Sequence, residues 1–546
     1  MKKSRILVAA SLAICLVCQS VGCTKDDKGN GDSNQEIKVF SSFIAAKGTR
    51  RNENNEIQNL IAEKIGAKCE ETWVDENKNP ADAVSEMIIS GKYPDFIHGG
   101  TEQQKLIDAN ALIPLDEYLD GYDNLKNYFT EEEWDKLRAE DGHVYMMPQF
   151  CKVYMYDTAT EHDGEAFWVQ VKVLQWAGYP ELKTLDDYFD LLERYLAANP
   201  TDANGNPNIG YEILTDGYLY FCLENPPQFL DGYPNDGSCI VDAEKLEALD
   251  YNTTPTAKKW FKKLNEEYHK GLIDQECFVL TADQYYEKIK SGTILGMVDQ
   301  YWNFKNVEGV LPDECKYVPF GIVIDESIEE QYHTATAFDA SQGMGISVDC
   351  EDIEGAMKFL NDLLSPEILT LRTWGIKDVD YCVDEDGMFY RTDEQARLYN
   401  DQAYKDKHLC DYNYFPFYGG MNFDGKNAFR SENQPSEFYK KLSGIMKECF
   451  SAYGVQTFTE MFNKSGENPP WYPVWSYTNT FTPDTTYGKA KADMDTIKHE
   501  YLPKVVMSDD FESSWAEYMA AYNANVDIKA YFDHLTEYIR KCAGEE

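Results

Sequence analysis

Strand and helix patterns alternate from residue 36 onward, and this alternation constrains the fold more than any other feature. Short apolar runs typical of strands occupy residues 37–40, 69–74 and 95–98. Helical spacing of apolar side chains occupies residues 54–65 and 80–90, and Gly66 is a stop signal for the first of these helices. Such an order predicts a parallel sheet with helices on both faces.

The same topology predicts where a ligand would bind. Ligands of open parallel sheets lie at the carboxyl ends of the strands. We therefore expect a site in the loops after Phe40, Val74 and Ile97.

The rest of the chain also contains both helix and strand patterns. We expect helices at 115–129, 131–140, 185–198, 255–269 and 351–364, and strands at 143–148, 293–299 and 317–324. From residue 439 onward the pattern is largely helical, apart from an irregular segment at 468–487 that is rich in Pro, Trp, Tyr and Thr.

Charge excludes one class of partner. The chain of 546 residues has 95 acidic and 51 basic side chains, a formal net charge of −44. A field of this sign repels polyanions, so we expect no binding to nucleic acid or to an anionic membrane surface.

The N-terminus carries an export pattern. Lys2, Lys3 and Arg5 precede an uncharged stretch at 6–18, which is too short to cross a bilayer but suits a secretory signal. Small residues lead to Cys23, and a polar tether follows at 24–35. This resembles a bacterial lipobox, so we expect signal peptide 1–22, a lipidated Cys23 and a flexible tether 23–35. The alternative is an ordinary signal peptide with a chance cysteine.

The other cysteines carry less information. Eleven of them, between Cys69 and Cys542, show no metal-like spacing. Cysteines that are scattered and odd in number are typical of small buried apolar residues rather than of a disulfide framework.

Enzyme signatures are missing from the sequence. It has no HExxH zinc motif, no GxSxG elbow and no complete dinucleotide-binding glycine pattern. With 95 carboxylates, chance acid/base pairs are unavoidable and indicate nothing by themselves.

One loop resembles a calcium site. Asp202, Asn204, Asn206 and Asn208 alternate as oxygen ligands do in calcium loops. Pro207 stands where such a loop needs glycine, and no acidic residue closes it. The alternative is an Asn/Gly-rich turn with side chain-to-backbone bonds, and no cofactor is required by either interpretation.

Aromatic residues concentrate in expected loops. They include Tyr301-Trp302 after the strand at 293–299, a cluster at 414–418, and Trp471, Tyr472, Trp475 and Tyr477. Flat rings stack on the apolar faces of sugars, while polar side chains bind the hydroxyls. Each ring taken alone is more typical of a residue in the hydrophobic core, but the set as a whole favours a sugar-binding cleft.

Several stretches together resemble a known family, the family 1 extracellular solute-binding lipoproteins of ABC importers, and in particular the long Firmicute members named for aldouronate transport. The matching stretches are 91–98 (GKYPDFIH), 110–118 (NALIPLDEY), 271–274 (GLID), 374–387 (WGIKDVDYCVDEDG) and 500–504 (EYLPK). They cover nearly all of the chain after the tether.

The resemblance implies an α/β fold of two lobes joined by hinge strands, with a ligand cleft between them. It divides the chain into a first lobe, 36–150 plus about 320–375, and a second lobe, 151–319 plus about 376–546. It also implies a monomer on the extracellular face of a bacterial membrane, attached only by acyl chains such as palmitate. Its partners would be an oligosaccharide and the permease subunits, and it would not be an enzyme.

For a neutral glycan, the expected ligand-binding residues come from both lobes and the hinge. They are Phe43, Trp73, His98, Gln149, Tyr154, Trp168, Trp302, Trp471 and Trp475. The segment 167–172 (FWVQVK) departs from the Arg/Asp-containing segment of relatives, which weakens the case for an acidic ligand. Three alternatives remain: a uronate-bearing glycan held by a cation such as Arg372, a surface glycoside hydrolase, and a peptide-binding lipoprotein.

Overall fold

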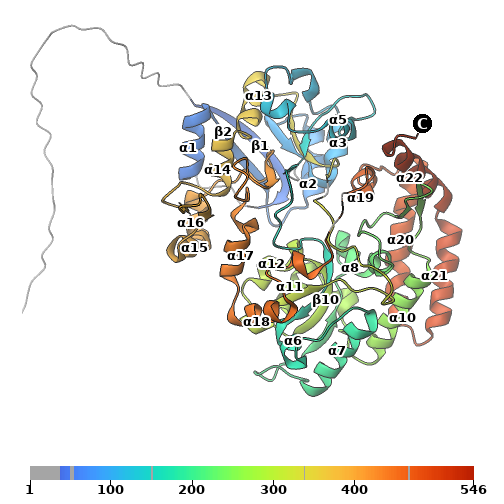
Figure 1. Cartoon of the computed structure of the whole chain (residues 1–546). Coiled ribbons are helices and arrows are strands. Elements are labelled where there is room, and N and C mark those ends of the chain that lie inside the picture. The colour runs from blue at the N-terminus through green and yellow to red at the C-terminus, as the bar shows by residue number, and fades with distance from the viewer. Residues whose placement is uncertain are drawn as a thin grey trace, which may run out of the picture. The chain divides into compact units, whose positions relative to one another are not determined.

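The computed structural model describes residues 37–48, 54–148, 152–336, 338–464, 466 and 468–545. The predicted lipidation residue Cys23, the signal peptide, the tether and Gln149 lie outside these ranges. The two sheets and the helices around them belong to the part of the chain from Ile37 onward (Figure 1).

The first sheet has five strands in the order β2-β1-β3-β12-β4. β1 (Lys38–Lys47) lies parallel to both β2 (Ala67–Val74) and β3 (Phe96–His98), as the alternation predicts. β12 (Gly343–Ile346) and β4 (Met147–Pro148) extend it in antiparallel pairs, so the sheet is mixed.

Local capping explains the helices between these strands. α1 (Glu56–Ile65) begins at Asn55, whose side chain accepts the Gln58 N–H, and ends at Gly66 with φ 79°. α2 (Pro80–Ser90) begins after Asn79, with a proline at the position that needs no N–H. Both helices confirm the predicted boundaries within two residues.

The expected helix at 115–129 is wrong in its extent. The chain forms a 3₁₀ turn, η2 (Leu115–Tyr118), and a single α-turn, α4 (Asp123–Lys126). Gly121 between them has φ 96°, which no α-helix contains. The extended stretch at 143–148 likewise pairs as a strand only at β4.

The second sheet has four strands in the order β11-β6-β10-β7. They are β6 (Glu165–Gln170), β7 (Ile209–Glu212), β10 (Ile294–Gln300) and β11 (Tyr317–Phe320). Helices α7 (Leu185–Ala198) and α10 (Pro255–His269) have the predicted bounds and pack against it through an extensive apolar core.

Three long helices close the C-terminal part. α20 (Thr486–Met507), α21 (Phe511–Asn525) and α22 (Ile528–Cys542) lie side by side next to α10 (Figure 1). The segment before them, predicted as irregular, contains the short helix α19 (Val474–Thr478). The Ser476 hydroxyl donates a hydrogen bond of 2.9 Å to Asp339, which tethers α19 to the segment that returns to the first sheet.

The core of the first sheet also takes residues from later in the chain. Cys410, Tyr412 and Phe415 are buried there, although the predicted division assigns everything after about 376 to the second lobe. Between the sheets, β5 (Lys152–Tyr154) pairs in parallel with β15 (Tyr418–Gly420). The lobe boundaries themselves stay a prediction.

Cysteines behave as the sequence indicates. Each of the ten described cysteines is free, and eight of them are buried. Within the described residues, therefore, apolar packing rather than disulfide bonding holds the fold.

Candidate functional site

The carboxyl edge of the first sheet brings two predicted site residues onto one face. Ile44 of β1 is in register with Trp73 of β2 on one side and with His98 of β3 on the other. Residues in register share a face of a sheet, so the indole and the imidazole flank Ile44. His98 is buried and Trp73 half-buried.

Tyr414, from a distant part of the chain, completes this arrangement. Its ring lies 4.8 Å from the His98 ring and 5.0 Å from the Trp73 ring, centroid to centroid, in edge-to-face geometry with both. Burial raises the pKa of Tyr414, and the nearby carboxylates of Asp411 and Glu71 add to the effect. We call Trp73, His98 and Tyr414 the first aromatic cluster.

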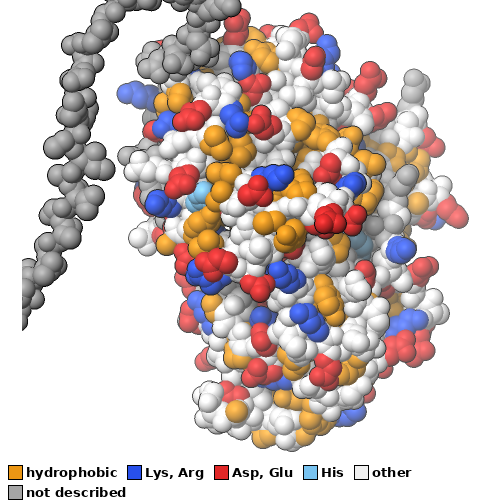
Figure 2. Space-filling model, turned by 60° about the vertical axis from the view of Figure 1, so that its left-hand side comes forward, with side chains coloured by type: hydrophobic (Ala, Val, Ile, Leu, Met, Phe, Trp, Pro, Cys, Tyr) orange, Lys and Arg blue, Asp and Glu red, His pale blue; other side chains and the backbone are white. Residues whose placement is uncertain are grey.

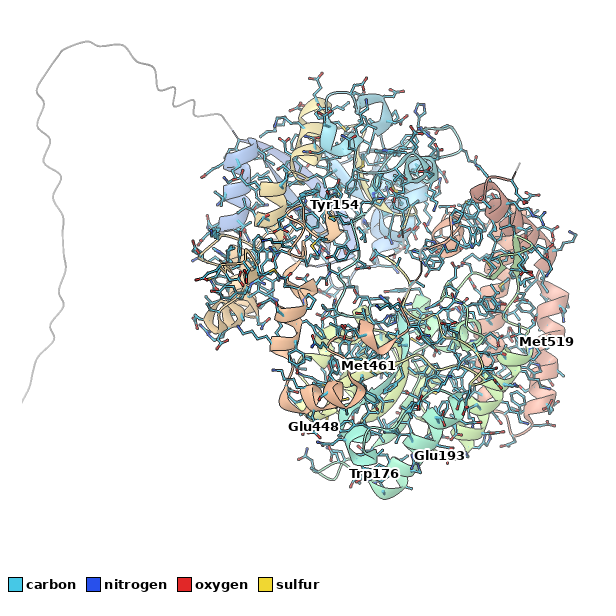
Figure 3. All side chains as sticks on the ribbon, viewed as in Figure 1. Tyr154, Trp176, Glu193, Glu448, Met461 and Met519 are labelled. Carbon is cyan, nitrogen blue, oxygen red and sulfur yellow. The ribbon has the colours of Figure 1, made fainter. Side chains whose placement is uncertain are left out.

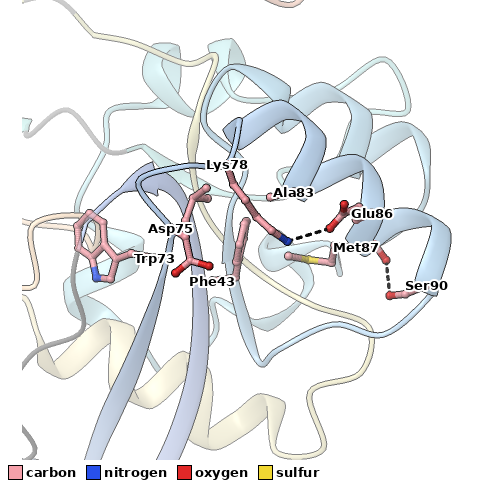
Figure 4. A pocket seen from close by; sticks show the side chains of 9 residues that line it. Phe43, Trp73, Asp75, Lys78, Ala83, Glu86, Met87 and Ser90 are labelled. Atoms are coloured by element: carbon pink, nitrogen blue, oxygen red, sulfur yellow. Dashed lines mark hydrogen bonds and ion pairs between the residues drawn. The ribbon is translucent and has the colours of Figure 1, made fainter. Parts of the chain in front are cut away.

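Phe43 lies on the opposite face of the same strands. It borders a pocket of about 330 Å³ between the ends of β1 and β2 and one side of α2, together with Asp75, Lys78 and Met87. Figure 4 shows Phe43, Lys78 and Met87 grouped there and the Trp73 ring turned to the other side of the strand. The Lys78 ammonium is 3.3 Å from the Glu86 carboxylate, so this cation is already paired.

The second sheet presents a tryptophan at an equivalent edge. β10 runs directly into α12 (Tyr301–Glu308), and Trp302 on its first turn is 40% exposed. The indole N–H donates to the side-chain oxygen of Gln300, and the Phe221 ring lies 6.2 Å away. Trp302 is thus oriented yet open to solvent.

A buried carboxylate holds Gln300 in turn. Glu165 Oε2 accepts hydrogen bonds from the amides of Asn235 at 2.7 Å, Asn225 at 3.0 Å and Gln300 at 3.4 Å. Burial raises the pKa of Glu165 to about 8, although these three hydrogen bonds lower it in part. Within the described residues Glu165 Oε1 is buried without a hydrogen-bond partner.

Tyr218 is a second exposed ring in the part of the chain that forms the second sheet. It follows β7 in a 3₁₀ turn, η3 (Gly217–Tyr220), and is 76% exposed. After burial and the two carboxylates, the Tyr218 phenol is a further group that raises the pKa of Tyr414.

Other predicted residues lie elsewhere. Trp168 is fully buried in a central strand, stacked on Tyr301 at 5.2 Å and donating its N–H to the Asp299 carbonyl at 2.8 Å. An enclosed ring has no face for a ligand, so Trp168 leaves the candidate set. Trp471 is 9% exposed and belongs to the same core, because the aromatic segment around it packs on the second sheet.

Tyr154 and Trp475 remain near the segments that join the lobes. Tyr154 on β5 is 36% exposed and packs 4.8 Å from the Phe423 ring. Figure 3 labels it beside the strands of the first sheet. Trp475 is half-buried on α19.

The predicted calcium loop is organised by its own hydrogen bonds. Asp202 accepts the backbone N–H groups of Asn204 and Asn206, each at 2.8 Å, and the Asn206 amide at 2.9 Å. Asn208 donates instead to the Asn199 carbonyl at 2.9 Å. These are the bonds of an Asx turn, and a single carboxylate is a weak donor set for calcium. No group of three or more His, Cys, Asp or Glu side chains in the described ranges could hold a metal ion.

Arg372, considered above as a partner for an acidic ligand, is committed elsewhere. It is 4% exposed and donates to five backbone carbonyls, including those of Asp411 at 2.9 Å and Pro416 at 2.7 Å. A guanidinium with its donors engaged cannot also fork a carboxylate.

Three residues of these edges went unpredicted as ligand contacts. Tyr414 stood out as part of an aromatic loop, but its position beside His98 depends on tertiary packing. Tyr218 follows a strand, β7, whose four residues are too short and too polar for periodicity to indicate. Gln300 directly precedes the aromatic pair Tyr301-Trp302, and this position in the sequence was the feature that could have indicated it as a site residue.

Comparison with known proteins gives the fold. No family model and no curated protein matches the chain. Solved structures do match: the S. pneumoniae ABC-transporter substrate binding protein FusA, an EF-hand mutant in complex with fructo-nystose, is 16% identical with a TM-score of 0.66, over 93% of this chain and 100% of that one.

Two further structures extend the comparison. An HMO-binding, ABC-transporter-associated solute-binding protein from Bifidobacterium longum infantis is 14% identical with a TM-score of 0.64, over 93% of this chain and 99% of that one. The alginate-binding protein AlgQ2, solved without calcium ion, is 14% identical with a TM-score of 0.61, over 93% and 98%. The predicted α/β fold with two lobes is confirmed.

Among the described residues, no helix combines the length and the apolar character needed to cross a bilayer.

Proposed function

We propose that this chain is the extracellular solute-binding protein of an ABC importer, and that it captures a neutral oligosaccharide between its two lobes without chemical change. The observation that carries the proposal is the pair of aromatic edges. Trp73, His98 and Tyr414 form a ring cluster at the edge of the first sheet, and the exposed rings of Tyr218 and Trp302 follow β7 and β10 of the second.

The chemistry of these edges suits sugar. Rings supply faces for the apolar side of a pyranose, and the neighbouring amides and carboxylates bind hydroxyls. A solute that touches both lobes favours the closed arrangement by its greater affinity for it. The solved structures with this fold include complexes with fructo-nystose and kestose, which supports a glycan as ligand.

Charge favours a neutral glycan over a uronate-bearing one. At the first edge, the carboxylates of Asp411 and Glu71 add to burial in raising the pKa of Tyr414. Arg372 binds backbone carbonyls and Lys78 pairs with Glu86. An anionic ligand would meet carboxylates without a free cation among these residues. The similarity to an alginate-binding protein keeps the acidic ligand as the alternative to test.

Membrane attachment is the second part of the proposal. Lipidation of Cys23 would hold the protein on the extracellular face of the membrane beside the permease subunits, as a monomer on a flexible tether. Cys23→Ser would then release the protein into the medium of expressing cells. Retention of this variant in the membrane fraction would contradict a lipid anchor.

The deciding experiment is calorimetry of the chain from residue 37 onward against neutral and uronate-bearing oligosaccharides, with chromatography of the same samples. We expect saturable binding of neutral glycans and no new products. Hydrolysis products would replace this proposal by a glycosidase. Absence of glycan binding at millimolar concentration would remove the sugar ligand.

A further inference from the structure

A second pocket, of about 180 Å³, is lined in part by Tyr301 and Lys305 of α12, the helix that also carries Trp302. It is bordered by α12, α17 (Pro435–Lys441) and α18 (Gly444–Tyr453), together with Glu161 and Glu432 from segments that join the lobes, and it is partly open to solvent. In Figure 1 these three helices lie on the same side of the second sheet. Its volume corresponds to about six water molecules at roughly 30 Å³ each, so it would hold a molecule of about six heavy atoms.

The outer side of this region is tied firmly to the sheet. Glu448 on α18 accepts a hydrogen bond of 2.9 Å from Tyr179, which follows α6 (Val171–Ala177). Figure 3 labels Glu448 and Trp176 there, close to the same helices. The pocket is therefore a feature of a packed scaffold, since α18 is anchored on the side opposite the cavity.

The pocket's charges can be accounted for one by one. Lys305 pairs with Glu161 at 3.4 Å, and Lys316 pairs with Asp313 at 3.0 Å. Glu432 faces Arg430 at 3.4 Å.

Glu308 is satisfied without a cation. It accepts the Tyr301 hydroxyl at 2.9 Å and the Tyr317 N–H at 2.7 Å. Burial raises the pKa of Glu308 to about 7, which reduces its negative charge at neutral pH. The remaining charge in the lining is Lys441.

Lys441 is an exposed lysine near the carboxylate of Glu432, which also faces Arg430. Within the described residues the Lys441 ammonium makes no hydrogen bond or ion pair, and its contact is the Tyr399 ring, 5.9 Å away. Partial burial lowers the pKa of Lys441, and the Arg391 guanidinium nearby acts in the same direction, against the carboxylate of Glu432.

A second cation beside Lys441 is also short of acceptors. Arg391 is 1% exposed, stacks on Tyr399 at 3.8 Å, and has no described acceptor for Nε and Nη1. Excess positive charge in a chain of net charge −44 is unusual. Figure 2, which turns this side forward, shows basic side chains among the acidic ones.

The opposite walls are apolar. Phe438, Met446 and Phe458 are buried around the cavity, and Leu442 lies beside them. Ser443 caps α18, so the first amides of that helix favour negative charge at the same end as Lys441. A pocket with a cationic end and an apolar wall is complementary to an amphiphilic anion.

We propose that this pocket binds a small carboxylate with a short apolar tail, its carboxylate on the Lys441 ammonium and its tail against Phe438, Met446 and Phe458. The site is independent of the glycan site, because none of its lining residues belongs to either aromatic edge. Since Glu161 and Glu432 belong to segments that join the lobes, an occupied pocket would brace that junction.

Calorimetry with three isosteres tests this on the chain from residue 37 onward: butyrate, butyramide and n-butylammonium. We expect butyrate to bind with one-to-one stoichiometry, butyramide at least tenfold more weakly, and n-butylammonium not at all. Lys441→Met is expected to weaken butyrate binding at least tenfold. Lys447→Met, on the neighbouring face of α18 and outside the pocket, is the matched control and should leave it unchanged.

A second measurement needs no substitution. With ¹³C-methyl methionine labels, butyrate should shift the Met446 signal and leave that of Met519, on α21, in place. The proposal fails if no butyrate binds at millimolar concentration, if n-butylammonium binds better than butyrate, or if Lys441→Met and Lys447→Met have equal effects. Glycan titration on the same sample separates these outcomes from failure of the glycan proposal.

Discussion

Trp73 and Tyr414 meet edge to face, with ring centroids 5.0 Å apart and planes at 85°, although most of the first lobe lies between them in the sequence. The same tyrosine lies 4.8 Å from His98. One side chain thereby joins the ends of two parallel strands into an aromatic surface, and the surface sits where parallel sheets bind ligands.

Tyr414→Ala is expected to weaken glycan binding by about 1–3 kcal/mol, the range for loss of one aromatic stacking platform. Calorimetry measures it, with Tyr390→Ala as a control because Tyr390 is an exposed tyrosine, at 38%, on a strand outside the edges. Equal losses for both variants would contradict a role for Tyr414 at the site.

Trp302→Ala is expected to weaken binding by a similar ~1–3 kcal/mol, because its exposed indole is the stacking face of the second lobe. Trp176 on α6 is a matched control, 47% exposed against 40% for Trp302. Unchanged affinity for Trp302→Ala, measured in the same titrations, would remove this residue from the site.

Trp168→Ala is expected to act on stability instead. Removing a fully buried indole leaves a cavity, and large-to-small changes of aromatic core residues cost about 3–5 kcal/mol. Urea unfolding measures this cost, and the folded fraction should retain its glycan affinity. A stable variant with lost affinity would return Trp168 to the ligand site.

Glu165→Gln is expected to change how stability depends on pH. The native pKa of about 8 lies above the ordinary value of 4.5, so the folded state holds this proton more tightly than the unfolded one. The associated stabilisation is complete below pH 4.5 and is lost as pH rises toward 8. Gln keeps an oxygen for the amide donors and cannot ionise, so its unfolding free energy should fall less across this interval. Parallel curves for the two proteins would refute the shift.

His408→Gln is expected to have an effect of the same sign from a different cause. His408 lies 3.0 Å from Glu56 and 3.0 Å from Asp380, and the hydrogen bond to Asp380 raises its pKa above the ordinary 6.5. The stabilisation is present below pH 6.5 and disappears as pH rises through the raised pKa. Unfolding at about pH 6 should therefore separate wild type from variant more than unfolding at about pH 9. A larger difference at the higher pH would contradict this sign.

Part of the site could be predicted because it depends on local pattern. Trp73 and His98 lie at the ends of strands that are predictable from adjacent residues and flanking helices, and parallel connectivity brings these ends to one edge. Trp302 was found in the same way, after β10.

Other residues could not be placed locally. Trp168 is buried because its strand, β6, lies between β11 and β10. Strand order is a property of the whole sheet and is not visible in the local sequence. The aromatic run that contains Trp471 looked irregular and accessible, yet it packs on the second core.

The sequence by itself determined the alternation of strands and helices, the boundaries of well-capped helices such as α1 and α2, and an acidity that repels polyanions. These follow from interactions within a few residues or from summed charge. The tertiary structure decided which rings are buried and which are exposed, that Tyr414 joins Trp73 and His98, and that Arg372 is committed to backbone carbonyls. Burial and charge pairing depend on residues distant in the chain, and only packing brings those residues together.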